Sequence, residues 1–208
     1  ETGSDRILKL INKGFDADTV VRSGCMAKDA DMILSEFILL GIGGKELSEE
    51  NAAQTAKALN IIQPDFIRVH ATGIKLESKL GEFVRDGSFT LQSEEEIVIE
   101  QKLFLQQLHE MDSYYVNEHI VNLLLEVRGN LRTEKQEMLS TIDRFLTLPP
   151  DERLLFTVGR RLNIFFRLDD LKKPKLHQKA GESLQQILSK NPHVDFAALC
   201  NYVRQSQI

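Results

Sequence analysis

The spacing of two short apolar segments constrains the fold of this chain more than any other feature. Residues 33–40 and 65–71 begin 32 positions apart, and residues 48–62 between them carry apolar side chains at helical spacing. A strand, a helix and a second strand in this order are typical of a right-handed βαβ unit with parallel strands. The sequence therefore predicts an α/β fold in which the apolar run 33–40 is buried on both faces.

Helix signals surround these strands. Ser4 is expected to cap a helix that Gly14 closes, and a second helix is expected from Asp16 to about Ala30. A third helix begins at Ser48, and its apolar stripe comprises Ala52, Thr55, Ala56, Leu59 and Ile62. Near residue 77 the pattern changes. Almost everything after it reads as helix, with capping boxes expected at residues 93–96 and 133–136.

This change divides the chain into two expected regions. Residues 1–76 would form the last strands of a partial (β/α) barrel, and residues 77–208 a mainly α-helical C-terminal region. Only two full strands are visible, with the tail of a third at Glu1, and so few parallel strands do not close a barrel. Because the first residue is Glu rather than Met, we expect the chain to be an inner piece of a larger fold.

Charge and composition exclude some functions. The net charge of −5 without a basic block disfavours nonspecific binding to nucleic acid. No apolar run approaches the roughly 18 to 20 residues of a membrane span, and no leader is visible, so the expected location is the cytoplasm. Cys25 and Cys200 form neither a disulfide framework nor a spaced metal motif. We expect no metal ligand in the chain.

Candidate site residues gather where the predicted strands end. In parallel α/β folds ligands bind beyond the carboxyl ends of the strands, which here means residues 1–4, 41–46 and 70–73. The glycines of Gly41-Ile42-Gly43-Gly44 either form a tight strand-to-helix turn or allow a ligand close to the backbone. Neither the Walker pattern nor the dinucleotide fingerprint fits. His70 and Arg68 share a strand face, and they either support the core as a hydrogen-bonded pair or line a site.

Three segments together resemble a known family. They are ETGSDRILKLINKG at 1–14, FILLGIGGKE at 37–46 and DFIRVHATGIKLESKLGEFVRDGSFT at 65–90. The combination is similar to the second half of radical S-adenosylmethionine enzymes, in the branch with oxygen-independent coproporphyrinogen oxidase and the methylthiotransferases. The likeness covers residues 1–90 and is weaker through about residue 148.

The resemblance implies a (β/α)6 barrel of an oxidoreductase. Such a parent enzyme binds S-adenosylmethionine beside a [4Fe–4S] cluster and cleaves it reductively to a 5′-deoxyadenosyl radical. Glu1 matches a residue that contacts the ribose. Lys13 matches a basic residue that meets the methionine carboxylate, although it could equally complement the dipole of its own helix. The cofactor-binding residues expected by this resemblance are Glu1, Ser4, Lys13, Gly41, Ile42, Gly43, Gly44, His70 and Ala71.

Two departures from the family pattern limit what this chain can do alone. Phe37 stands where some relatives have a ribose-binding acid, and the motif of three closely spaced cysteines is absent. Thiolates hold such a cluster, so we expect a catalytically inactive fragment without an assigned catalytic residue, whose cofactors are complete only in a parent protein. The substrate is not readable from the helical region.

Two other interpretations stay open. The chain could be a non-catalytic module that binds a partner through an exposed sheet, because unpaired strand edges accept further strands. It could also be part of an ordinary TIM-barrel enzyme with a phosphate site at Gly43-Gly44. Self-association is expected if an opened barrel leaves apolar strand faces uncovered.

Overall fold

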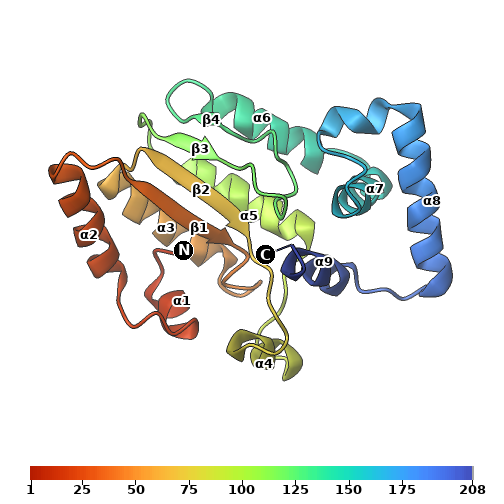
Figure 1. The fold of residues 1–208 in the computed structure, drawn as a ribbon, viewed down its shortest axis with the longest axis horizontal. Helices are drawn as coiled ribbons and strands as arrows, with labels where there is room; N and C mark the ends of the chain where they lie inside the picture. Colours follow the sequence, from red (N-terminus) through yellow and green to blue (C-terminus); the bar gives the residue numbers. More distant parts are fainter. Residues whose placement is uncertain (208) are drawn as a thin grey trace.

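The computed structural model describes residues 1–207, which contain a four-stranded sheet (Figure 1). Its order is β1-β2-β3-β4, where the strands are Ser35–Leu40, Phe66–Ala71, Tyr114–Val116 and Gly129–Asn130. The pairs β1–β2 and β2–β3 are parallel, and β4 runs antiparallel to β3. The predicted α/β class and parallel βαβ unit are confirmed. The three parallel strands are joined by helical crossovers, and the sheet of residues 1–207 is open rather than closed into a barrel.

The described helices fall into two groups. The first lies before β3 in the chain and consists of α1 (Asp5–Leu10), α2 (Ala17–Asp29), α3 (Ser48–Ile62), α4 (Lys79–Arg85) and α5 (Glu94–Gln107). Of these, α3 and α5 contact β1, and α2 contacts α3. The second consists of α6 (Lys135–Leu146), α7 (Pro150–Arg161), the 3-10 turn η1 (Leu168–Lys172), α8 (Pro174–Lys190) and α9 (Phe196–Gln205). The region after residue 77 is mainly helical, as expected. Within it, α8 and α9 both contact α7.

Helix α3 forms the inner layer with α5. Its predicted stripe from Ala52 to Ile62 is buried, and the helix ends at Gln63, which adopts a left-handed conformation with φ 50° before Pro64. Three residues of the stripe, Ala52, Ala56 and Leu59, belong to one apolar cluster with Ile38 and Val69 of the adjacent strands. In Figure 1, α3 and α5 lie behind β1 and β2, while the other face of the sheet is open.

The expectation that the first strand is buried on both faces is wrong. Burial alternates in β1 and β2, and Phe37 is 48% exposed whereas Ile38 is buried. The reason is that α3 and α5 cover only the face to which the even-numbered side chains of β1 point. The other face carries Phe37 and, on β3, Tyr114, which is 39% exposed.

Strands β3 and β4 were not expected after residue 77. The segment Tyr114–Val116 extends the parallel sheet beyond β2, and α5 is the crossover that leads to it. Strands of three and two residues are too short to show a period of two in the sequence. Strand β3 forms because the edge of β2 supplies a partner for its backbone groups, and β4 then pairs with β3.

Two of the predicted helix boundaries need correction. Ser4 and Ser93 cap α1 and α5 as expected, and the capping box of Ser93 is complete. However, α1 ends at Leu10 rather than at Gly14, because Asn12 already turns the chain with φ 56°. The predicted capping box at residues 133–136 is absent, since the Thr133 hydroxyl donates to Asn130 instead.

The predicted third strand is reduced to one contact. Glu1 lies outside the strands, but its carbonyl oxygen accepts a hydrogen bond from the Leu39 N–H at 2.8 Å. The start of the chain therefore lies beside β1. None of the helices in residues 1–207 combines the length and the apolar character needed to cross a membrane.

Candidate functional site

The turn Gly41–Gly44 follows β1 directly and is buried. Gly41 and Gly44 adopt φ values of +81° and +62°, which favour glycine. Three backbone N–H groups already have acceptors: Gly41 donates to Glu100, Gly44 to the Gly41 carbonyl and Lys45 to the Thr90 carbonyl. The space beside the backbone is filled as well, because a Cβ at Gly43 would lie 2.9 Å from Ile7 Cδ1 and from Leu47 Cβ. The turn is therefore closed in this conformation.

Glu100 of α5 binds the backbone at the start of the turn. Its carboxylate is buried on α5 and accepts hydrogen bonds from the Gly41 N–H (3.2 Å), the Ser48 hydroxyl (2.9 Å) and the Asn51 amide (2.7 Å). Burial raises the pKa of Glu100 above its ordinary value, although these hydrogen bonds oppose the shift. Asn51 also donates to the Leu39 carbonyl, so the end of β1 is fixed on both sides.

The candidate residues Glu1 and Lys13 contact each other in the structure. The Lys13 ammonium forms an ion pair with the Glu1 carboxylate, and both side chains are about one third exposed (32% and 33%). Ser4 lies elsewhere: its hydroxyl donates to Glu50 at 2.5 Å and accepts from the Ile7 N–H at 3.3 Å. Ser4 is thus occupied as a helix cap, whereas the Glu1–Lys13 pair faces solvent.

His70 lies on the open face of the sheet. Its ring is edge-on to Phe37, with centroids 5.5 Å apart, and it contacts the His119 ring at a centroid distance of 4.4 Å and a tilt of 32°. Burial, together with the charges of His119 and Arg68, lowers the pKa of His70 below its ordinary value. The neutral imidazole is therefore the favoured form near neutral pH. Arg68 donates to Ser35 at 3.0 Å, so Arg68 and His70 are not a hydrogen-bonded pair.

Ala71 faces the core and contributes its backbone. Its N–H donates to Asn122 Oδ1 at 2.7 Å, and the Asn122 amide donates to the Val69 carbonyl at 2.6 Å. The Asn122 side chain thereby takes the place of a neighbouring strand at the end of β2. Candidate residues Ala71 and His70 therefore lie on opposite faces of the same strand.

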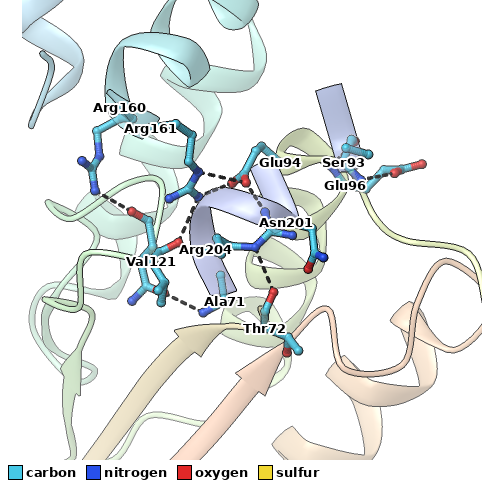
Figure 2. Close-up of polar contacts among 12 residues, drawn as sticks. Ala71, Thr72, Ser93, Glu94, Glu96, Val121, Arg160, Arg161, Asn201 and Arg204 are labelled. Carbon is cyan, nitrogen blue, oxygen red and sulfur yellow. Dashed lines mark hydrogen bonds and ion pairs between the residues drawn. The ribbon is translucent and has the colours of Figure 1, made fainter. Parts of the chain in front are cut away.

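A buried ionic network lies beyond the end of β2 (Figure 2). The Glu94 carboxylate accepts from Arg161 Nε (3.1 Å) and Nη2 (2.5 Å) and forms a second ion pair with Arg204. Burial alone would raise the pKa of Glu94, but the charges of Arg161 and Arg204 outweigh it and lower the pKa. Arg204 also donates to the Thr72 carbonyl at 2.8 Å, so the network ties α9 to the end of β2.

Arg160 is a second buried cation near this network. Its guanidinium donates to backbone carbonyls, including those of Leu123 (3.0 Å) and Asn122 (2.8 Å). Burial, with the charge of Arg161 beside it, lowers the pKa of Arg160 to about 10. These bonds fix the loop that carries Asn122.

The residues described here do not suit an iron–sulfur cluster. No group of three or more potential metal ligands occurs in residues 1–207. Cys200 is 2% exposed, and burial raises the pKa of its thiol to about 12, which opposes the thiolate form that clusters require. Cys25 lies apart on α2. Residues 1–207 therefore lack the donor set for such a cluster.

Sequence reasoning missed the residues that build this end of the sheet. Glu100 offers a signal, because a carboxylate interrupts the helical stripe between Ile97 and Phe104. Arg204 offers a weaker one, following the stripe that includes Cys200. Asn122 lies in a loop without periodicity, and only the tertiary structure identifies it.

The comparisons with known proteins give one structural likeness to report. No known family matches the chain, and a search of curated proteins finds no significant match. Among solved structures, it is similar to Elp3 of the archaeon Methanocaldococcus infernus, determined with residues 1–46 deleted, at 19% identity and a TM-score of 0.45. The likeness covers 53% of this chain and 26% of the Elp3 chain, so the match spans about a quarter of that protein.

Proposed function

We propose that this chain is the C-terminal part of a radical S-adenosylmethionine enzyme and contributes binding groups for that cofactor. The proposal is supported by the sequence resemblance together with one observation. Glu1, the glycine turn and His70 come from three separate segments, and all three lie at the carboxyl ends of β1 and β2 or beside them. This is where parallel α/β folds bind ligands.

The Glu1–Lys13 pair and His70 are the groups that best fit the cofactor. Lys13 would pair with the methionine carboxylate, and Glu1 would accept hydrogen bonds from the ribose. His70, neutral and beside Phe37, would lie against the adenine ring. Ser4 and Ala71 would support the neighbouring binding residues without donating to the cofactor, because the Ser4 hydroxyl and the Ala71 N–H already donate hydrogen bonds within the chain.

The iron–sulfur cluster would come from another part of a parent protein. When bound, the cluster would supply the electron and S-adenosylmethionine the 5′-deoxyadenosyl radical. The residues of this chain bind and orient the nucleoside. We therefore expect the chain alone to bind no iron and to release no 5′-deoxyadenosine.

Cofactor binding is tested by titrating the isotope-labelled chain with S-adenosylmethionine and following amide and His ring signals by NMR. We expect shifts at Lys13 and His70, and we expect Lys13→Gln to weaken binding about tenfold, as for the loss of one charge-assisted hydrogen bond. Lys9→Gln is the matched control, because Lys9 is an exposed lysine on α1, close to Lys13 in the chain. Equal affinity of the two variants would contradict the assigned role of Lys13.

The phosphate-site alternative makes a different prediction. It requires free N–H groups at Gly43-Gly44, but the N–H groups of Gly41, Gly44 and Lys45 already donate within the chain. Titration with a phosphate ester should leave the amide signals of the turn unchanged. Shifts confined to the turn would favour the phosphate site instead.

A partner-binding role is favoured by the open face of the sheet. Phe37 and Tyr114 are exposed there, and the edge of β1 carries a single backbone contact with Glu1. Such an edge can pair with another strand, including that of a second copy. Sedimentation of the wild type and of Phe37→Ser would test this, since self-association through this face should weaken in the variant.

A further inference from the structure

Several segments of residues 1–207 contribute no member to the main apolar cluster, and two of these segments, residues 72–92 and α9, contact each other. This cluster joins the sheet with α3 and with α5 to α8, but none of its members comes from residues 72–92 or from α9. Ile74 and Phe89 are buried without belonging to it. Segments with few apolar contacts to the core are those that open at the lowest free energy.

The two segments are held to each other by polar contacts. The Asn201 side chain donates to the Ile74 carbonyl at 2.9 Å and accepts from the Ile74 N–H at 2.8 Å. Three positions along α9, Arg204 donates to the Thr72 carbonyl and pairs with Glu94 at the start of α5. Figure 2 shows α9 beside the end of β2 with these side chains pointing toward it. Helix α9 is thus hydrogen-bonded to residues 72 and 74, which directly follow β2.

Residues 72–92 in turn cover the glycine turn. The Thr90 carbonyl accepts from the Lys45 N–H at 3.0 Å, and the Thr90 hydroxyl donates to Glu46 at 2.5 Å. A Cβ at Gly44 would lie 2.8 Å from the Thr90 carbonyl oxygen and 3.0 Å from the ring of Phe89. This segment therefore closes the Gly44 and Lys45 side of the turn.

We propose that residues 72–92 and α9 form one lid over the Gly41–Gly44 turn, latched by Asn201 and Arg204, and that this lid opens without unfolding the sheet. Opening frees the Lys45 N–H and the backbone of Gly44, so the end of β1 becomes accessible to a ligand. Closing restores the contacts of Ile74, Thr72 and Thr90. The lid is a property of the fold and does not depend on which ligand binds there.

Native-state hydrogen exchange of the full chain at low denaturant tests the lid without a variant. The amides of Ile74, Phe89, Lys45 and the second half of α9 should exchange through one shared opening, while those of Val69 and Leu59 stay protected. Exchange of all these amides through a single global unfolding would overturn the proposal. Independent openings of α9 and of residues 72–92 would do so as well.

Asn201→Leu tests the latch. It removes both hydrogen bonds to Ile74 while keeping a side chain of similar size, and we expect about 10- to 100-fold faster exchange at Ile74, Phe89 and Lys45. Tyr202→Leu is the matched control, because Tyr202 is the next residue of α9 and is 65% exposed. This variant should change the exchange rates of the same amides by no more than about twofold, as is usual for surface substitutions.

Lys45 is the decisive amide in this comparison. Faster exchange of α9 with an unchanged Lys45 amide would show that the helix does not control the turn, and would overturn the proposal. Neither measurement involves S-adenosylmethionine. Failure of the lid is therefore distinguishable from failure of the proposed cofactor role.

Discussion

Replacing the buried Glu94 with Gln should destabilise the chain more than removing one charge from an exposed ion pair. Glu94 is the shared anion of Arg161 and Arg204, and the side chains of all three residues are at most 4% exposed. The amide of Gln is nearly isosteric, so the change removes the charge without leaving a cavity. It leaves the two guanidinium groups in a buried site with no anion. The NH2 group of Gln then takes the place of one carboxylate oxygen and cannot accept a hydrogen bond from them.

The magnitude follows from the burial of the network. Breaking a buried ion pair by removing one partner costs about 3 to 5 kcal/mol, because the remaining charge is uncompensated. For a chain of this length, 1 kcal/mol corresponds to about 2 to 4 °C in melting temperature, so Glu94→Gln should lower it by about 6 to 20 °C. Glu95→Gln is the matched control, since Glu95 is the next residue, is 44% exposed and pairs with Arg153 at 3.0 Å. An exposed pair of this kind contributes less than about 1 kcal/mol.

The free energy of unfolding is measured by urea titration followed by circular dichroism at 222 nm. The pH dependence gives a second check on the same variant. Because the folded pKa of Glu94 is lowered, its contribution is fully present above the ordinary carboxylate pKa and is lost as the pH falls through the folded value. The gap between wild type and Glu94→Gln should therefore narrow in acid. A loss at pH 7 equal to that of Glu95→Gln would refute the reasoning.

Three further predictions concern the ends of β1 and β2. Burial raises the folded pKa of Glu100, so its contribution to stability is fully present below the ordinary carboxylate pKa and is lost as the pH rises through the folded value. In urea titrations the stability of Glu100→Gln relative to wild type should therefore increase as the pH rises above the ordinary carboxylate pKa. Gly43→Ala should cost about 1 to 3 kcal/mol because its Cβ would lie 2.9 Å from Leu47 Cβ, whereas Gly181→Ala, with open space around it, should be neutral or stabilising. By NMR, the His70 ring should titrate below its ordinary pKa of 6.5, and the midpoint should rise in His119→Asn. A His70 midpoint at or above 6.5 in the wild type would contradict the burial of the ring beside His119.

The βαβ unit could be predicted because its signals are local. The stripe of α3, the stop at Pro64 and the apolar residues of β2 each occupy a continuous stretch of sequence. The Ser93 capping box is equally local, since it joins residues three apart. The exposed side of β1 was not predictable, because it depends on whether another layer covers that face.

The candidate site was predictable only in part. Gly41 and Gly44 are recognisable as turn residues, and the structure gives both the positive φ that glycine favours. Whether such a turn is open or closed depends on Thr90 and Phe89, which are more than 40 positions away in the chain. The ion pair of Glu1 and Lys13 joins residues that are 12 positions apart, and the family resemblance assigns both to the cofactor without predicting that they pair.

The sequence alone determined the first two strands, the helix between them and several helix starts, because capping, helical periodicity and turn chemistry act over a few residues. Only the tertiary structure decided how polar groups are paired in the interior. Glu94 meets Arg204 across 110 positions, and Glu100 meets Gly41 across 59. Buried charges and amides must find partners wherever the packed layers bring them, and these partners carry no local signature. They lock the end of β2 to α9 and close the glycine turn.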